Sequence, residues 1–118
     1  MKYKILLAFV SLSLSILHTQ ILVAKTKEYY LTIENHVFSP TKLVIQANEK
    51  VMLKITNKDP VAEEFDSFDL NREKVIFAGK QATIYIGPLE PGIYEYFGEF
   101  HPNSARGEII VEESKNAD

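Results

Sequence analysis

Apolar and polar residues alternate over short stretches of the chain, which is the pattern of β-strands with one buried face. In residues 51–56, for example, Val51, Leu53 and Ile55 fall on one face of an extended chain. No stretch shows sustained helical periodicity. The pattern predicts seven strands, at residues 30–34, 42–46, 51–56, 75–77, 82–86, 93–97 and 107–112.

Turn-forming residues separate these segments. Residues 38–41 (Phe-Ser-Pro-Thr) predict a bend, and Asn57 to Pro60 ends the strand before it. Gly87-Pro88 and Pro91-Gly92 bracket a tight connection into the last two strands. Short strands about 8–12 residues apart with turns between them are typical of sandwiches. The sequence therefore predicts an all-β fold, a Greek-key β-sandwich of about seven short strands.

The first 24 residues differ from the rest and predict an export signal. Lys2 and Lys4 precede an apolar run from Ile5 to Leu17, and Ala24 is a small residue at the expected cleavage point. An uncleaved membrane anchor is the alternative, but the run has 13 residues, whereas a span needs ~20. We therefore expect a signal peptide at 1–24, a single domain at 25–118 without a membrane span, and a periplasmic location.

Charge and composition exclude several classes of binding partner and ligand. Two of the 13 basic residues lie in residues 1–24, so residues 25–118 carry 11 basic and 16 acidic side chains, a formal net charge of −5. An acidic surface argues against nucleic acid or anionic lipid as a partner. The chain has no cysteine, which excludes disulfides, thiolate metal ligands and a lipid-modified cysteine anchor.

The loop between the last two predicted strands contains the strongest candidate ligand, His101. A loop held between two paired strands is a common position for metal ligands. The imidazole group suits copper, iron or zinc. Glu99 falls on the same side as His101 if residues 97–101 are extended. The alternative is a histidine that only stabilises the loop through hydrogen bonds.

Acidic residues are concentrated in residues 61–74. If residues 64–70 are extended, Glu64, Asp66, Phe68 and Leu70 share one face, which would lead two carboxylates into the core side. Together with Glu63, these carboxylates are candidate oxygen ligands for a metal ion. The alternative is a solvated acidic surface whose charges pair with Arg72 or Lys74.

Other features of the sequence give weaker evidence about function. We interpret His36, near the first bend, as a structural or surface residue. A mixed imidazole and carboxylate set favours Cu(II), Fe or Mn over Cu(I). The chain contains no nucleophile motif and no phosphate-binding loop. Glu64 and Glu99 could supply paired carboxylates for glycoside hydrolysis, but a small sandwich leaves little room for a sugar. The sequence therefore leans away from an enzyme.

The chain resembles the cupredoxins. The residues that carry the resemblance are Phe38-Ser39-Pro40 for an early Phe-x-Pro bend, Asp66-Ser67-Phe68 where a His-x-Phe ligand segment is expected, Tyr96 or Phe97 at the cysteine, His101 at the histidine, and Ala105-Arg106-Gly107 for Met-x-Gly. A blue-copper centre needs a cysteine thiolate with two histidines. Because the cysteine is missing, the chain is not a blue-copper electron carrier.

Within that family, residues 63–67, 70–75 and 87–101 are similar to cysteine-less exported proteins that accompany bacterial iron-permease uptake systems. This resemblance implies a periplasmic accessory in iron or copper handling, with a bound copper or iron ion. It also implies an inner-membrane iron permease or a periplasmic iron-binding protein as partner. Two alternatives remain open: a metal-free module that docks on such a partner, and a copper-dependent protein that oxidises Fe(II).

Overall fold

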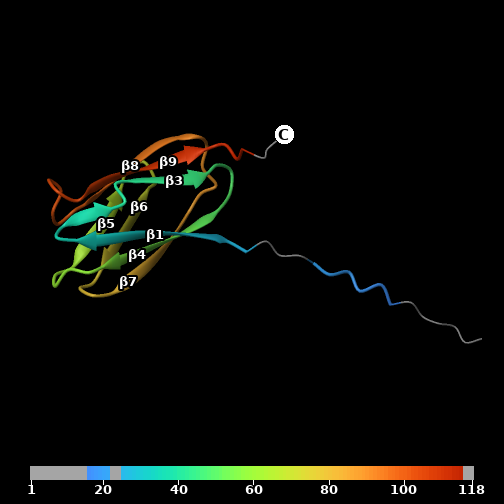
Figure 1. Ribbon diagram of the computed structural model, residues 1–118, viewed down its shortest axis with the longest axis horizontal. Coiled ribbons are helices and arrows are strands. Elements are labelled where there is room, and N and C mark those ends of the chain that lie inside the picture. The colour runs from blue at the N-terminus through green and yellow to red at the C-terminus, as the bar shows by residue number, and fades with distance from the viewer. Residues whose placement is uncertain (1–15, 22–24, 116–118) are drawn as a thin grey trace, which may run out of the picture.

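The computed structural model describes residues 16–21 and 25–115, and this part of the chain is a β-sandwich without helices (Figure 1). The predicted all-β sandwich is confirmed. Its strands are β1 (Lys27–Glu34), β2 (Val37–Ser39), β3 (Lys42–Gln46), β4 (Val51–Asn57), β5 (Glu63–Ser67), β6 (Arg72–Ile76), β7 (Gln81–Ile86), β8 (Gly92–Gly98) and β9 (Arg106–Glu112). In the described part, no helix is long and apolar enough to span a membrane. Most of the predicted leader, 1–24, lies outside the described residues.

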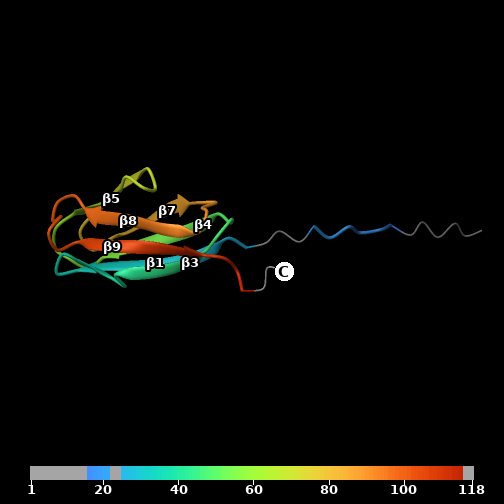
Figure 2. The ribbon, with the colours of Figure 1, turned by 90° about the horizontal axis from the view of Figure 1, so that it is seen from above.

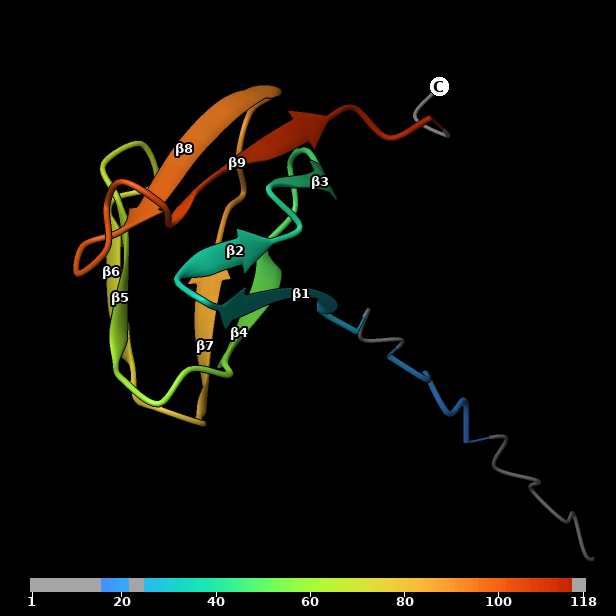
Figure 3. The same ribbon diagram turned by 60° about the vertical axis from the view of Figure 1, so that its left-hand side comes forward.

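Two sheets form the layers of the sandwich. One has four strands in the order β2-β1-β4-β7, and the other has five in the order β3-β9-β8-β5-β6. Most neighbouring strands are antiparallel, but β1 pairs parallel with β4, and β3 pairs parallel with β9. Figure 3 shows β8 and β9 in one layer and β1 and β4 in the other. Residues 16–21 and the end of β9 lie at one end, and the loop after β8 lies at the opposite end (Figures 1 and 2).

The core follows from the predicted alternation. Val51, Leu53 and Ile55 of β4 are completely buried, as the sequence pattern indicated. An aromatic cluster of Phe38, Phe65 and Tyr96 joins the two sheets, with the Tyr96 ring 5.0 Å from each of the other two ring centroids. Burial raises the pKa of Tyr96, and its hydroxyl donates a hydrogen bond to the Pro40 carbonyl at 3.3 Å.

Two of the nine strands, β2 and β5, are not among the seven predicted. β2 forms where only a bend was expected, and β5 ends at Ser67, so that residues 64–70 are not extended throughout. β6 also begins three residues before the strand predicted at 75–77. The predicted inward face of Glu64, Asp66, Phe68 and Leu70 is therefore wrong: Phe65 is fully buried, whereas Phe68 is 80% exposed.

The reason is a turn that follows β5. The Ser67 hydroxyl accepts the Leu70 N–H at 3.1 Å and donates to the Glu95 carbonyl at 2.6 Å. This turn lets Leu70 reach the core while Phe68 points away. Because side chains alternate along a strand, burying Phe65 also turns Glu63 inward. Glu64 and Asp66 then lie on the outer face.

Candidate metal centre

Two loops and the start of a strand, at the same end of the sandwich, bring His36, Glu63 and His101 together. His36 lies in the turn between β1 and β2, Glu63 begins β5, and His101 follows β8. Because β5 and β8 are antiparallel, the start of one meets the end of the other, as the pairing of Phe65 with Gly98 shows. One ligand atom from each of the three residues lies within 4.8 Å of the other two.

The Glu63 carboxylate holds the His101 ring. Glu63 is only 2% exposed, and its Oε2 lies 2.5 Å from His101 Nδ1. Its other oxygen accepts the backbone N–H groups of Phe100 at 2.9 Å and Glu64 at 3.1 Å. Gly98 leaves the space for this carboxylate, since a Cβ atom at residue 98 would lie 2.6 Å from Glu63 Cδ. His101 is thus oriented through Nδ1.

A second buried carboxylate, Asp59, plays a similar part for His36. Asn35 and His36 adopt left-handed backbone conformations, with φ of 54° and 59°, and their N–H groups donate to Asp59 at 2.6 and 2.9 Å. Asp59 Oδ2 also lies 3.4 Å from His36 Nδ1. That nitrogen is buried and has no hydrogen-bond partner in the described part of the chain.

Hydrogen bonds through the buried side chain of Asn57 fix the position of Asp59. Its N–H donates to Asn57 Oδ1 at 2.9 Å, and the buried Asn57 amide donates to the carbonyls of Val61 and Ile76 at 2.8 and 3.0 Å. Burial raises the pKa of the Asp59 carboxyl. However, the N–H groups of His36 and Asn35 and the charges of His36 and His101 outweigh burial, so this pKa lies below its ordinary value. Asp59 therefore stays negative beside the imidazoles.

The rings of His36 and His101 stack on one another. Their centroids are 3.6 Å apart and their planes differ by 13°. Each ring has its Nδ1 beside a buried carboxylate, and within residues 16–21 and 25–115 neither Nε2 has a hydrogen-bond partner. Two imidazoles and a carboxylate fit a copper or iron ion, whose ligands in proteins include imidazole and carboxylate groups.

The sequence-predicted ligands divide into two groups. Glu63 and His101 lie in the cluster, whereas Glu64, Asp66 and Glu99 do not. Residues 99–104 form a turn and not an extended segment. The backbone N–H of His101 donates to the Gly98 carbonyl, and the backbone carbonyl of His101 accepts the Ala105 N–H. The prediction that Glu99 and His101 lie on the same side of an extended segment is therefore wrong.

Sequence reasoning missed His36 and Asp59. Asn35-His36 carries a local turn signal, since asparagine and histidine tolerate the left-handed conformation. However, nothing local indicates that the His36 ring lies on His101, which is distant in sequence.

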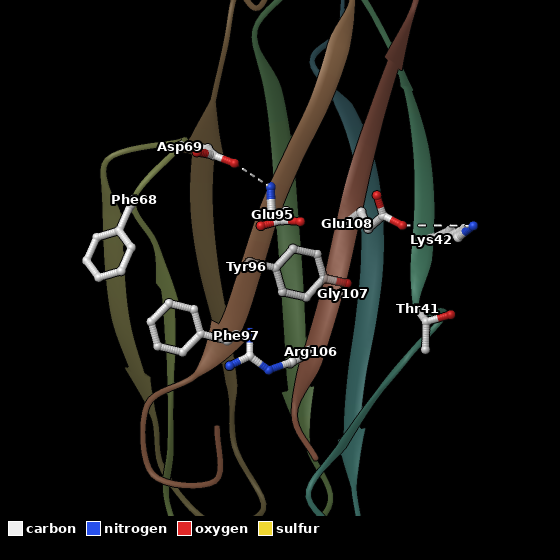
Figure 4. Close-up of a pocket in the computed structure, with 10 residues that line it drawn as sticks. All are labelled: Thr41, Lys42, Phe68, Asp69, Glu95, Tyr96, Phe97, Arg106, Gly107 and Glu108. Atoms are coloured by element: carbon white, nitrogen blue, oxygen red, sulfur yellow. Dashed lines mark hydrogen bonds and ion pairs between the residues drawn. The ribbon is translucent and has the colours of Figure 1, made fainter. Parts of the chain in front are cut away.

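A groove lies away from this centre, on the outer face of the five-stranded sheet. It encloses about 520 Å³ and is lined by residues of β8, β9 and the turn after β5. Figure 4 shows Phe68 and Phe97 at one side of it, with Arg106 beside Phe97. The Arg106 guanidinium lies 5.8 Å from the centroid of the Phe97 ring. The groove thus combines exposed aromatic surface with a cation.

Comparison with known proteins gives a consistent picture. The sequence model of the cupredoxin-like domain matches residues 4–111. An uncharacterized protein of Rickettsia prowazekii (strain Madrid E) is 43% identical over 84 residues, which cover 71% of this chain and 67% of that protein.

Solved structures share the fold at low sequence identity. The metal-binding domain of the Cu(I)-exporting P-type ATPase CopA of Streptococcus pneumoniae D39 has a TM-score of 0.67 and 16% identity, covering 79% of this chain and 92% of that one. Auracyanin A, a "blue" copper protein from Chloroflexus aurantiacus, has a TM-score of 0.64 and 12% identity. The match covers 75% of this chain and 100% of the auracyanin chain. A heme-copper terminal oxidase matches with a TM-score of 0.61 and 23% identity over 73% of this chain, which spans 65% of the oxidase chain.

Proposed function

Because this chain belongs to the cupredoxin-like domain family, we propose that it is an exported metal-binding accessory protein in copper or iron handling. The observation that carries the proposal is the paired-histidine centre, which consists of His36, His101 and Glu63 with Asp59 behind His36. Two loops and the start of a strand converge there, and the two histidine rings are not part of the hydrophobic core. Fold stability alone does not require two stacked imidazoles at the end of a sandwich.

The donor set separates this protein from blue-copper electron carriers. The chain contains no cysteine, and Ala105, which stands where the resemblance predicts the axial methionine, is completely buried and carries no donor atom. Nitrogen and oxygen donors favour Cu(II) or iron over Cu(I), which prefers sulfur. A bound copper ion would supply one-electron redox chemistry, and the oxidation of Fe(II) remains an alternative activity.

The protein's own groups prepare the two rings. Glu63 and Asp59 face Nδ1 of His101 and His36 respectively. A carboxylate at one ring nitrogen fixes the tautomer and the ring orientation and raises the basicity of the other nitrogen. Each histidine can then offer Nε2 to a metal ion. The pKa of Asp59 lies below its ordinary value because the N–H groups of His36 and Asn35 and the neighbouring imidazoles outweigh burial, which favours the ionised carboxylate.

Calorimetric titration of Cu(II) into the full chain tests the function. His101→Ala and His36→Ala should each weaken binding at least ~10-fold, since even a supporting group costs that much. His18→Ala is the matched control, because His18 is exposed and hydrogen-bonds only to Ile16 in the described part; it should not change the affinity. The copper-loaded protein should show weak d–d absorption only. Equal Cu(II) affinity of the wild type and His101→Ala would refute the proposal.

The proposed location and partners rest on the sequence resemblance described above. An inner-membrane iron permease or a periplasmic iron-binding protein would exchange the ion with the paired-histidine centre. The position of the centre supports such an exchange, because it lies at the end of the sandwich away from residues 16–21 and the end of β9 (Figure 1).

Docking without metal is the second candidate function. The observation that favours it is the groove with Phe68, which is 80% exposed beside Phe97 and Arg106. Exposed aromatic residues and arginine are enriched at protein interfaces. If the wild type binds no Cu(II), while Phe68→Ala abolishes cross-linking to the permease, this function would replace the first.

A further inference from the structure

Three apolar side chains form a row across the outer face of the five-stranded sheet. Ile110 of β9 pairs with Ile93 of β8 on one side and with Val44 of β3 on the other, and directly paired residues point to the same face of a sheet. The adjacent residues Ile109 and Ile45 are buried in the core, so the row points outward. Ile93 is 62% exposed and Val44 is 49% exposed. We call Val44, Ile93 and Ile110 the apolar row.

Two aromatic rings continue this face beyond the apolar row. Phe68 is 80% exposed, and its ring centroid lies 5.5 Å from that of Phe97. Along β8, Ile93, Glu95 and Phe97 point outward in alternation, which places the rings and the apolar row on one surface. Phe68 projects beside the groove of about 520 Å³ described above (Figure 4). Exposed apolar side chains gathered on one face are typical of an interaction surface.

The same face carries two charges of opposite sign that have no ion-pair partner among the described residues, Arg106 and Glu95. The Arg106 guanidinium lies over the Phe97 ring, 5.8 Å from its centroid. Glu95 lies directly opposite Glu108 of β9, and like charges in that position repel each other. Lys42 is 3.9 Å from Glu108 and pairs with it. The face therefore offers one unbalanced cation and one unbalanced anion.

We propose that the outer face of β3, β8 and β9 is the interface of a two-fold symmetric dimer of this chain. A two-fold axis brings the same surface of two copies together, so that each contact occurs twice with the roles exchanged. Such a surface needs both charges, as well as projecting and hollow parts. This face has them in Arg106 and Glu95, and in Phe68 beside the groove.

The charges favour a second copy over a different partner. In the dimer, Arg106 of each copy would pair with Glu95 of the other copy, which would offset the repulsion between Glu95 and Glu108. A partner with charges of a single sign would balance only one of the two. The dimer would fill the groove that the metal-free docking function assigns to a permease, so the two uses of the groove exclude each other. This inference does not depend on the proposed function.

Sedimentation equilibrium of the full chain tests the dimer. The wild type should associate reversibly into dimers as its concentration rises. Arg106→Glu and Glu95→Arg should each weaken association at least ~10-fold, because like charges would then face each other twice across the interface. The double variant Glu95→Arg/Arg106→Glu should restore association, since it re-creates both pairs with the signs exchanged.

Lys80→Glu is the matched control for the charge reversals. Lys80 is exposed in the turn before β7 and has no ion pair in the part of the chain that the structure describes. The same change of charge at this position should leave association unchanged. Phe68→Ala should weaken association at least ~10-fold, as expected for an aromatic residue at the centre of an interface. Its control is Phe77→Ala, because Phe77 is 67% exposed but follows β6 at the edge of the sheet.

Three results would overturn the dimer. The first is a wild type that stays monomeric at every concentration. The second is association that survives Arg106→Glu, since another surface would then hold the copies together. The third is a double variant that folds but does not associate. Thermal unfolding of each variant shows whether it folds.

The dimer and the Cu(II) site can fail separately. His101→Ala should weaken Cu(II) binding and leave the dimer intact, whereas Arg106→Glu should weaken the dimer and leave Cu(II) affinity unchanged. Loss of the dimer in His101→Ala would show that the paired-histidine centre joins the copies, and it would overturn the interface proposed here.

Discussion

At the scale of single residues, Asp59 shows how one buried carboxylate connects the fold to the paired-histidine centre. It accepts the N–H groups of two consecutive left-handed residues, Asn35 and His36. Without these bonds the turn would expose two unsatisfied donors next to the core. The same carboxylate faces His36 Nδ1. A residue that shapes the turn therefore also aims the imidazole.

Asp59 should make the stability of the protein sensitive to acid. Burial alone would raise the pKa of Asp59, but the backbone hydrogen bonds from His36 and Asn35 lower it below its ordinary value of 3.8. Its contribution is therefore present above pH 3.8 and is lost as the pH falls through the lower pKa of the folded state. Urea unfolding between about pH 5 and pH 2 should show a steeper loss of stability for the wild type than for Asp59→Asn. Glu90→Gln, at an exposed loop position, should follow the wild type. Parallel curves for Asp59→Asn and the wild type would contradict the role of Asp59.

At the scale of elements, β5 determines which acids reach which site. Phe65 is anchored in the core against Tyr96, so Glu63 must point inward and Glu64 outward. A slip of one residue would exchange the two faces. It would turn Glu64 and Asp66 toward the core and Phe65 away from it. The anchored aromatic ring therefore maintains the inward position of Glu63 in the paired-histidine centre.

Contact between β8 and β5 leads to a prediction about Gly98. In Gly98→Ala the new Cβ would lie 2.6 Å from Glu63 Cδ and 2.7 Å from Ala105 Cβ. The Glu63 carboxylate must then move away from His101. We expect a loss of ~1–3 kcal/mol in the free energy of unfolding, as for other overpacked sites, and Cu(II) affinity at least ~10-fold weaker. Urea unfolding and calorimetry measure the two effects.

Gly92→Ala provides the matched control, since Gly92 belongs to the same strand and its Cβ would lie 3.7 Å from Tyr94, an ordinary contact. It should leave Cu(II) affinity unchanged. Normal Cu(II) affinity in Gly98→Ala would show that Glu63 does not orient His101.

At the scale of the whole molecule, residues 16–21 and the end of β9 lie at one end of the sandwich, away from the paired-histidine centre (Figures 1 and 2). Residues 16–21 are exposed and form no strand. The paired-histidine centre lies at the opposite end, beside the loop after β8 (Figures 1 and 2). A leader attached at the N-terminus of β1 therefore need not contact the centre.

Removal of the leader should leave the domain intact. If residues 1–24 are a cleaved signal, mass spectrometry of the exported protein should give a chain that begins near Lys25. A chain produced from Lys25 onward should unfold with the same free energy as the full chain, because residues 16–21 are exposed. Recovery of the full-length protein from the inner membrane would contradict cleavage. A marked loss of stability on removal would show that the leader contributes to the fold.

Most of the fold was predictable from the sequence because strand alternation is a local property. Seven strands and the buried faces of β4 and β7 follow from residues two apart. The short strand β2 and the early end of β5 were not predictable from alternation. β2 has only three residues and forms by pairing with β1 across the turn at Asn35 and His36, and β5 ends where the Ser67 hydroxyl bonds Leu70 and the distant Glu95. Apolar spacing alone did not reveal that Ser67 turns the chain.

The candidate site, like the fold, was predictable from the sequence only in part. The sequence by itself determined that no thiolate is available as a metal ligand, because the chain has no cysteine, and it indicated His101 and the acids near residue 64 as candidate ligands. Only the tertiary structure decided that His36 lies on His101, that Glu63 faces inward, and that Glu64 and Asp66 lie outside the cluster. The physical reason is that donor chemistry belongs to each residue, whereas convergence depends on the strand order, and the strand order is set by packing of residues far apart in the chain.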